Sequence, residues 1–495
     1  MKRGSGEIFI GLDLGTTVCK GIAVDRNLNV LSQAESPCPL ITRSALEIEQ
    51  DAEQWLTVSA AVIRRLLAGA AFEPESVASL SISAQGISFV PVDAGGKPLR
   101  TALTWLDTRA LRQAERIAAE YGERELFAAT GKPVGSAYVL PKLLWLKENE
   151  PELFGRTRRI LMALDFLTAR LCGAFVTDHT MASGTSLYDL HSQRWSLPIL
   201  ERFALDPGLL PELRWSGSAA GRLGPAIACE LGLSPRTLVV VGGQDQKVAA
   251  LGAGIDPERI TLSLGTAMAM TRTCAHPVID GGMRVPCFSY LLPNAWVLEG
   301  SGIGTSCLDW VRATMLAGRS YAALEAAARE LDGAANRLYF YPFLAGTDTL
   351  HRGEAVRGFL YGIDFSVTPG RIVKSVHEGI AYQIREHLDL LESISGPVRE
   401  LRLFGGGARS RSWAQTIADV AARQVVLPSS PEMGCLGAAI LAATGAGVFA
   451  APQEAFSLLR VKRRFEPRER LRGMYEEQYG EYLEIQRRMF GEARA

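Results

Sequence analysis

The sequence predicts an α/β protein built from two related domains that contain mixed sheets. Nearly the same sequence motif occurs twice, as GLDLGTT at 11–17 and as TLSLGTA at 261–267. Each copy is predicted to begin a β-hairpin. Short apolar strands also alternate with amphipathic helices in both halves. The length of 495 residues allows two or three domains, each with its own core. We expect one domain over residues 1–252 and a second over 253–495, joined without a flexible linker.

The bulk composition is that of a globular protein and argues against some partners. Apolar residues make up 47% and charged residues 21%. Lys+Arg and Asp+Glu both number 53, which argues against nucleic acid or an anionic membrane as the main partner. The eight cysteines show no C-x-x-C pair and no signal peptide is evident, so we expect reduced thiols and a cytoplasmic protein. Residues 433–452 carry no charge, but their small side chains favour a buried helix over a membrane span.

The first half begins with three predicted strands, EIFIGLD, VCKGIAV and LNVLSQA. An amphipathic helix follows, for which Asp51 is the expected N-cap. Its apolar face is formed by Trp55, Val58, Val62 and Leu66. VASLSIS at 77–83 is the next strand, and TLVVVGG at 237–243 is a buried strand that leads into Gln244 and Asp245.

The second half repeats this plan. Strands surround SLGT and NAWVLEG, and a long helix is expected after Thr368-Pro369. The strand ELRLF at 400–404 leads into three glycines at 405–407 and then into another helix. The C-terminal segment is charged and helical, and packing against the first domain is one option for it.

Asp13 stands at the end of an apolar strand, directly before the turn at 15–17. A carboxylate there can hold Mg²⁺ through water, and glycine lets the turn's N–H groups approach a phosphate. The structural alternative is a hairpin in which Asp13 caps its own backbone. The second copy has Ser263 where the first has the carboxylate. Together the two turns predict a clamp that holds the phosphates of one nucleotide.

Asp245 lies inside GGQDQK, where a strand ends. It can take the proton from an attacking hydroxyl, which is worth roughly 10²–10⁴ in rate, or serve as the N-cap of a helix that begins near Gln246. The loops at 84–88 and 105–109 offer amide, carboxylate and aromatic groups suited to a polyol, although Trp105 also fits a core position.

Two glycine-rich runs lack the spacing of the common nucleotide motifs. Thr305 occupies the last glycine position of a G-x-G-x-x-G pattern that begins at Gly300, and no Walker motif stands out. A Rossmann or P-loop fold is therefore not predicted. The run at 405–407 either approaches a nucleotide or forms a tight turn.

The order of the motifs closely resembles that of the FGGY carbohydrate kinases, within the larger actin/Hsp70/hexokinase-like ATPase group. The resemblance runs from Ile8 to about Gly447 and rests on GLDLGTT, TWLDTR, TGKPVGSAYVLPKLLWLKENEP, FVTDHTMASGTSLYD, GGQDQ, SLGT, YFYPFLAGT, RGFLYGI and LFGGGARSRSW. It implies two ribonuclease H-like domains with mixed sheets and an interdomain cleft. It also implies ATP, Mg²⁺ and phosphorylation of a hydroxyl of a small sugar or polyol. A homodimer is a further expectation from the family.

The resemblance also implies roles for particular residues. Asp245 looks like the catalytic base, and Asp13 looks like the carboxylate of the metal site. The implied nucleotide contacts are Gly15, Thr16, Thr17, Gly265, Thr266, Gly304, Gly406, Gly407 and Ala408. The implied substrate contacts are Gln85, Gly86, Ile87, Trp105, Asp107 and Asp245.

The motifs are most similar to those of xylulokinases, with one departure. Xylulokinases usually read Q-M-H-G in the substrate loop, whereas this chain has Ile87 in place of the histidine. A ketopentose is therefore the first expectation, while ribulose, erythritol and glycerol stay open. The alternative from another class is a non-catalytic or sugar-sensing ATPase of the same group. Asp245 and the polar loops before it favour the kinase.

Overall fold

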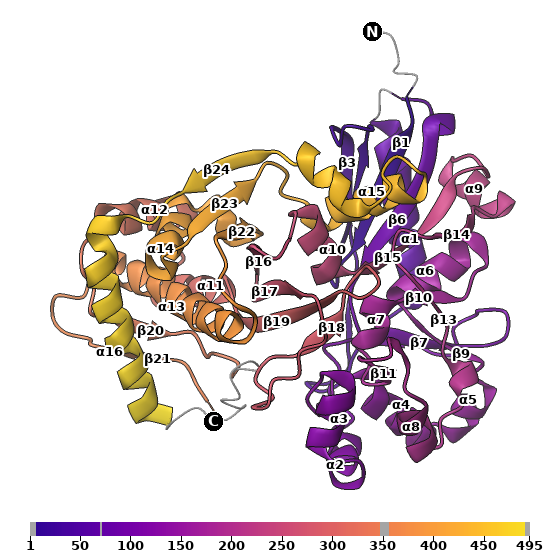
Figure 1. The fold of residues 1–495 in the computed structure, drawn as a ribbon, viewed down its shortest axis with the longest axis horizontal. Helices are drawn as coiled ribbons and strands as arrows, with labels where there is room; N and C mark the ends of the chain where they lie inside the picture. Colours follow the sequence, from indigo (N-terminus) through magenta and orange to yellow (C-terminus); the bar gives the residue numbers. More distant parts are fainter. Residues whose placement is uncertain (1–5, 70–71, 347–355, 491–495) are drawn as a thin grey trace.

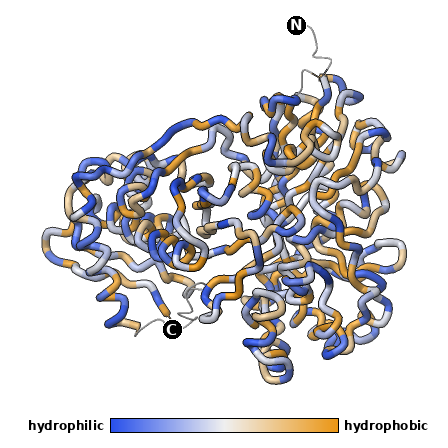
Figure 2. The backbone as a smooth tube through the Cα atoms, viewed as in Figure 1, coloured by the Kyte–Doolittle hydropathy of each residue, from blue (hydrophilic) through white to orange (hydrophobic). Residues whose placement is uncertain are grey.

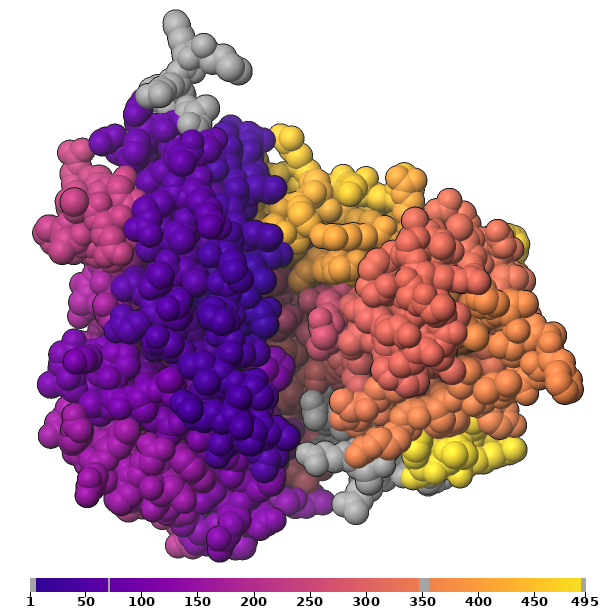
Figure 3. Space-filling view, turned by 180° about the vertical axis from the view of Figure 1, so that it is seen from behind, coloured from indigo at the N-terminus to yellow at the C-terminus, as the bar shows by residue number. Residues whose placement is uncertain are grey.

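The computed structural model describes residues 6–69, 72–346 and 356–490, and it has two lobes (Figure 1). The larger lobe holds the N-terminal half of the chain, and the smaller lobe holds most of the C-terminal half. The space-filling view shows a groove between them (Figure 3). Three parts of the sequence predictions lie outside the described residues. They are residues 1–5 of the first predicted domain, residues 491–495 of the second, and Thr347 of the motif YFYPFLAGT.

A six-stranded mixed sheet forms the centre of the larger lobe, in the order β14-β15-β6-β1-β2-β3. Strand β1 (Ile8–Leu14) is antiparallel to β2 (Val18–Val24) and parallel to β6 (Val77–Ala84). The remaining strands are β3 (Val30–Pro37), β14 (Ala219–Arg222) and β15 (Leu238–Gln244). The predicted first hairpin is therefore the β1–β2 pair at the centre of this sheet.

A second sheet of the larger lobe lies below the first in Figure 1. It has the order β4-β5-β8-β7-β9. Its strands are β4 (Ile41–Thr42), β5 (Ile48–Gln50), β7 (Phe89–Val92), β8 (Ala102–Leu103) and β9 (Arg159–Met162). Two short pairs complete the lobe: β10 (Val176–Asp178) with β13 (Glu212–Arg214), and β11 (Tyr188–Asp189) with β12 (Arg194–Trp195).

The smaller lobe repeats the plan of the first sheet. Strand β16 (Arg259–Leu264) is antiparallel to β17 (Ala267–Cys274) and parallel to β22 (Glu400–Phe404), as β1 is to β2 and β6. The seven-stranded order is β18-β19-β17-β16-β22-β23-β24. The other strands of the lobe are β18 (Cys287–Ser289), β19 (Trp296–Ile303), β20 (Tyr339–Tyr341), β21 (Phe359–Tyr361), β23 (Gln424–Pro428) and β24 (Val461–Phe465). The duplicated phrase thus marks a duplicated sheet, and the prediction of two domains with mixed sheets is confirmed.

Helix α1 (Ala52–Ala68) begins after Asp51, whose side chain accepts a hydrogen bond from Glu53 N, and the predicted apolar face is buried. The other helices of the larger lobe are α2 (Leu111–Glu120), α3 (Glu123–Thr130), α4 (Val139–Asn149), α5 (Pro151–Arg156), α6 (Ala163–Cys172), α7 (His179–Ser183), α8 (Leu197–Arg202), α9 (Pro225–Leu231) and α10 (Asp245–Gly252). The second half adds α11 (Ser306–Thr314), α12 (Tyr321–Glu330), α13 (Pro369–Ser395), α14 (Arg411–Ala421), α15 (Met433–Gly445) and α16 (Arg472–Phe490). Short 3₁₀ turns, such as Gly406–Arg409, connect several of these elements.

Helix α15 crosses from the second half of the chain to the sheet of the first lobe, where it packs on β1 and β6. A Cβ atom at Gly11 would lie 2.0 Å from Cys435 O, and one at Gly437 would lie 1.9 Å from Val248 O. The helix therefore approaches its neighbours closely because both surfaces carry glycine. This agrees with the buried helix expected for the uncharged segment, and no described helix is long and apolar enough to cross a membrane.

Helix α16 packs on α13 and α14 of the smaller lobe, so the option that it packs against the first domain is wrong. The physical reason is that tyrosines of α16 contact residues of the smaller lobe. The rings of Tyr341 and Tyr482 stack at 4.3 Å, and Tyr479 donates a hydrogen bond to Asp389 at 3.0 Å. Figure 2 shows hydrophobic segments inside the lobes, while the outermost strand β24 is hydrophilic. The partners of α16 thus lie in the second lobe's core.

Candidate active site

Asp13 and Asp245 lie at the same edge of the first sheet. In the strand register Asp13 is opposite Ser83, and Ser83 is opposite Gly243. Strands β1, β6 and β15 are parallel, so their carboxyl ends meet at one edge, and Asp245 follows two residues after Gly243. The two carboxylates are close enough for the charge of Asp13 to raise the pKa of Asp245. Two residues far apart in sequence therefore share one site.

The Asp13 carboxylate accepts a hydrogen bond from Ser83 Oγ at 2.7 Å. Desolvation raises its pKa to about 6, although the Ser83 bond opposes that rise. A Cβ atom at Gly434 of α15 would lie 2.5 Å from Asp13 Oδ2, so a glycine there makes room for the carboxylate. A carboxylate with a raised pKa lacks a fully compensating charge, which a divalent cation supplies. Asp13 therefore fits a magnesium ligand, since Mg²⁺ bound to phosphates needs only one or two carboxylates.

Asp245 is the first residue of α10, and Gln244 rather than Asp245 is the N-cap of this helix. The alternative of Asp245 as an N-cap is therefore wrong. Asp245 Oδ1 accepts hydrogen bonds from Gln246 N at 2.7 Å and from the side-chain amide of Gln244. Desolvation, together with the charge of Asp13, raises the pKa of Asp245 to about 7. A carboxyl group with a pKa near neutral suits the role of a general base.

The predicted substrate loop touches the strand that leads to Asp245. A Cβ atom at Gly86 would lie 2.9 Å from Gln244 Cγ, so Gly86 leaves space for that side chain. Ile87 has a φ of 49°, an unusual backbone conformation for a β-branched residue and one that costs energy. Its Cγ2 atom would meet a Cβ atom at Gly184 at 3.0 Å. Strain of this kind is found where a loop is held in place for function.

The side chains of Gln85 and Trp105 are both hydrogen-bonded to other protein groups, and Trp105 reaches the turn at 15–17. Gln85 is buried, donates to Gln50 Oε1 at 2.7 Å and accepts from Ser88 Oγ at 3.2 Å. Trp105 is 41% exposed, and its indole Nε1 donates to Thr16 Oγ1 at 2.8 Å. Trp105 is thus no core residue, whereas the amide of Gln85 is occupied by other protein groups.

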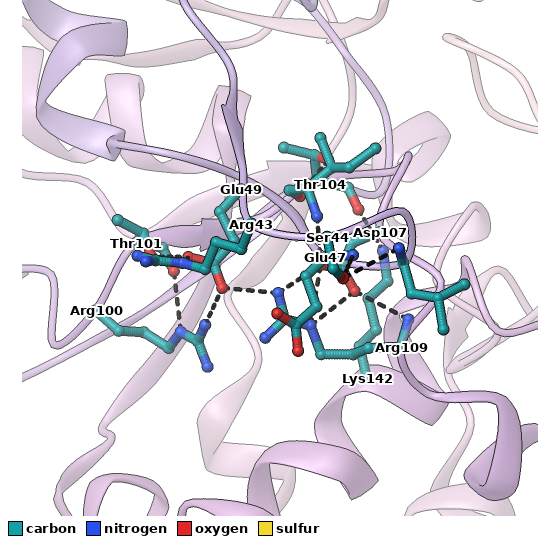
Figure 4. Close-up of polar contacts among 12 residues, drawn as sticks. Arg43, Ser44, Glu47, Glu49, Arg100, Thr101, Thr104, Asp107, Arg109 and Lys142 are labelled. Carbon is teal, nitrogen blue, oxygen red and sulfur yellow. Dashed lines mark hydrogen bonds and ion pairs between the residues drawn. The ribbon is translucent and has the colours of Figure 1, made fainter.

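The Asp107 carboxylate is fully buried and bonded to its own loop and to β5, as Figure 4 shows. It accepts from Ile48 N at 3.0 Å and from Arg109, whose guanidinium also pairs with Glu49 at 2.7 Å. Lys142 Nζ donates to Thr104 O at 2.7 Å beside this network. The Asp107 side chain therefore holds the loop at 105–109 in place, and its carboxylate is occupied by protein groups.

Three glycine-containing segments of the second lobe come together at the second turn. Gly304 N donates to Thr266 O at 2.9 Å, and a Cβ atom at Gly304 would lie 2.3 Å from Gly265 O. Gly405 has a φ of 90°, and a Cβ atom there would lie 2.8 Å from Leu264 O. A Cβ atom at Gly407 would lie 2.5 Å from Leu264 Cδ2. The predicted nucleotide residues Gly304 and Gly407 therefore reach the second turn because they carry no side chain.

A cavity of about 540 Å³ opens beside these glycines. Its lining includes Gly406 and Gly407, whereas Ala408 packs against the second core. The volume lies within the range of nucleotide-sized pockets. Residues to which the sequence assigned no nucleotide contact also line it: Thr305, Tyr321, Glu325, His377, Ser410 and Trp413. The imidazole and indole rings of His377 and Trp413 stack at 4.5 Å, which stiffens one wall.

The two halves of the site are connected by β19. Lys247 of α10 pairs with Glu299 of β19 at 2.7 Å, and β19 ends at Ile303, directly before Gly304. Lys247 Nζ also lies 3.6 Å from the centre of the Phe288 ring. The helix that starts with Asp245 is therefore tied to the strand that leads into the second turn.

Only the motif LFGGGARSRSW, which includes Ser410 and Trp413, carried a sequence signal for the cavity.

The fold and the site together define a class, the phosphotransferases that act on a sugar hydroxyl. The model of the FGGY carbohydrate kinase N-terminal domain matches residues 8–252, and that of the C-terminal domain matches residues 260–446. The chain belongs to the FGGY family of carbohydrate kinases.

Relatives within the family differ in their named substrates. The chain is 30% identical to the xylulose kinase of Bacillus subtilis over 90% of this chain and 89% of that protein. It is 28% identical to the gluconokinase of the same organism, over 88% of this chain and 86% of that protein. The crystal structure of a xyloylose kinase from Brucella ovis superimposes with a TM-score of 0.90 at 28% identity, covering 98% of this chain and 99% of that one.

Proposed function

We propose that the protein transfers the γ-phosphoryl group of ATP to a hydroxyl of a small open-chain sugar, with a ketopentose as the first candidate. The observation that carries this proposal is the placement of Asp13 and Asp245 at one sheet edge, next to the strained loop at Ile87. The similarity to proteins named xylulose kinase supports the ketopentose. The similarity to a gluconokinase and the isoleucine at position 87 keep other sugars and polyols, such as ribulose, erythritol and glycerol, as alternatives.

Each residue set has one task in the proposed reaction. ATP supplies the phosphoryl group, and Mg²⁺ neutralises the charge of its phosphates. Asp13 would hold the metal, while backbone N–H groups of the turns at 15–17 and 265–266 would hold the phosphates. The segment of Gly406, Gly407 and Ala408 would face the adenosine, with the ring of Trp413 close by. The groove between the lobes would close over the reactants, because water would otherwise hydrolyse the ATP.

Asp245 would act as the general base. One carboxylate oxygen, Oδ1, is held by Gln246 N and by the Gln244 side chain. The other oxygen would accept the proton of the sugar hydroxyl while that hydroxyl attacks the γ-phosphorus. Phosphoryl transfer needs positioning and charge stabilisation more than covalent help. The Trp105 ring would then cover the carbon chain of the sugar, and Gln85, Gly86 and Asp107 would fix the surrounding loops.

The decisive experiment is ADP release, measured in a coupled assay over a panel of pentuloses, gluconate and polyols. We expect ADP release that depends on one compound or a narrow group, with the ketopentoses first. ATP hydrolysis that no compound changes would instead favour the sugar-sensing or non-catalytic ATPase.

The cytoplasm is the compartment that we propose, since the reaction uses ATP and all eight cysteines are free thiols. A homodimer stays a prediction from the family.

A further inference from the structure

A closed ring of hydrogen bonds, buried at Gln50, Gln85 and Ser88, joins the turn at 15–17 to the predicted substrate loop. Its members, in order, are Thr16, Gln50, Gln85, Ser88 and Trp105. Four of these residues belong to the two predicted binding loops and the phosphate turn. Gln50 belongs to none of them, because it is the last residue of β5 in the second sheet.

Gln50 uses both ends of its amide. Its Nε2 donates to Thr16 O at 2.7 Å, and its Oε1 accepts from Gln85 Nε2 at 2.7 Å and from Trp55 Nε1 at 3.1 Å. Its side chain is only 1% exposed. A buried amide with all these partners fixes the distance between the groups that it connects, since each lost bond would cost a desolvated polar atom.

The neighbouring residue serves a different network. Glu49 binds Arg43, Arg100 and Arg109, as Figure 4 shows. Successive side chains of a strand point to opposite faces, so Glu49 and Gln50 extend from β5 in opposite directions. The ion-pair cluster around Glu49 therefore supports the back of the substrate loop, whereas Gln50 supports the side that faces the phosphate turn.

The ring closes through Trp105. Its backbone N donates to Ser88 Oγ at 3.0 Å, and its indole Nε1 donates to Thr16 Oγ1 at 2.8 Å. Gln85 N also donates to Leu14 O at 2.9 Å, directly before the turn. A ligand that orders the turn at Thr16 must therefore also order the loop at 85–88, because the same bonds hold both.

We propose that Gln50 is a positioning residue that couples the phosphate turn to the substrate loop. Nucleotide binding at the turn would thereby prepare the loop for the sugar, and the acceptor hydroxyl would keep a fixed position relative to the γ-phosphate. This inference rests on the proposed function, because it needs a sugar loop and a phosphate turn in one reaction. In this proposal Gln50 acts through Thr16 and Gln85 rather than by contact with a reactant.

The test uses the full chain and the non-hydrolysable analogue AMPPNP with Mg²⁺. Amide hydrogen exchange is followed in the peptide that contains residues 85–88. In the unaltered protein the analogue should slow exchange there by about fivefold, the effect of one neutral hydrogen bond. Gln50→Ala should abolish this protection. Gln50→Glu keeps the shape and both acceptor contacts but cannot donate to Thr16 O, so it should abolish most of the protection as well.

Gln113→Ala is the matched control. Gln113 is also a buried glutamine of the first lobe, and its Nε2 donates to Glu148 Oε2 at 2.6 Å, away from the ring. This variant should keep the protection. Equal protection in Gln50→Ala and the unaltered protein would overturn the proposal, as would the absence of protection in the unaltered protein.

Measurement of KM and kcat distinguishes a failure of this inference from a failure of the proposed function. With a sugar that is turned over, Gln50→Ala should raise the KM for that sugar by about 25-fold, the effect of losing the two hydrogen bonds of the ring that Gln50 makes, and change kcat less. If no sugar is turned over, the proposed function fails, while the exchange experiment still decides the coupling. If AMPPNP gives no thermal shift with the unaltered protein, both proposals fail.

Discussion

The charge of Asp13 reaches Asp245 across one intervening strand and raises the pKa of its carboxyl group. Two acidic groups at one edge repel each other, so the unliganded site is electrostatically unfavourable. A divalent cation at Asp13 would remove this repulsion. The same pair would therefore supply both the proposed metal ligand, Asp13, and the proposed base, Asp245, whose pKa lies near neutral.

Replacing Asp245 by asparagine should remove the proposed base without changing the size of the side chain. We expect kcat to fall by about two orders of magnitude or more, which is the usual contribution of general-base catalysis. ATP binding, measured by calorimetry, should persist. Asp93→Asn is the control, because Asp93 caps a turn on the surface of the same lobe. Turnover near normal in Asp245→Asn would remove the assignment of the base.

The hydrogen bond from Ser83 to Asp13 favours the ionised carboxylate. Ser83→Ala should therefore weaken the apparent affinity for Mg²⁺, measured at saturating ATP, by about tenfold or more, since hydrogen bonds to charged groups contribute about 1.5–3 kcal/mol. Ser81→Ala is a matched control on the same strand, because the buried Ser81 Oγ has no hydrogen-bond partner among the described residues. An equal effect of the two changes would contradict the role of Ser83.

Gly434 allows α15 to pass over the Asp13 carboxylate. In Gly434→Ala the new Cβ atom would lie 2.5 Å from Asp13 Oδ2, which is too close for the carboxylate to keep its place. We expect a loss of about 1–3 kcal/mol in the free energy of unfolding, together with weaker Mg²⁺ binding. Gly480→Ala in α16 is the contrasting change, because nothing lies within 4 Å of its Cβ position. Chemical denaturation should show Gly480→Ala to be as stable as the unaltered protein or more so.

Burial lowers the pKa of Lys142 from 10.5 to about 7. Between these two values the unfolded chain binds more protons than the folded protein, so this residue makes stability rise with pH. Lys142→Met should remove that contribution. The difference in unfolding free energy between the unaltered protein and the variant should then increase by at most about 1.4 kcal/mol per pH unit above pH 7. Urea denaturation at pH 7.5, 8.5 and 9.5 measures this slope, and a difference that stays constant would show that Lys142 is charged in the folded protein.

Local sequence determined most of the elements near the site. Asp51 could be identified as the N-cap of α1 because its side chain accepts a hydrogen bond from a backbone N–H group only two residues further on. The buried face of α1, which includes Trp55, followed from helical periodicity. The duplicated phrase at 11–17 and 261–267 predicted two related hairpins, since a Gly-Thr turn between apolar runs encodes its own geometry. The resemblance to the family then supplied the order of the parts.

Only the tertiary structure decided what those elements meet. It gave the N-cap of α10 to Gln244, directed the amide of Gln85 to Gln50 and placed α16 on the second lobe. It also brought His377 and Trp413 from separate helices to one cavity. Periodicity and turn chemistry act over a few neighbouring residues, so the sequence specifies hairpins, caps and faces. Contacts such as that of Gly434 with Asp13 join residues hundreds of positions apart, and they exist only once α15 has packed on the sheet of the first lobe.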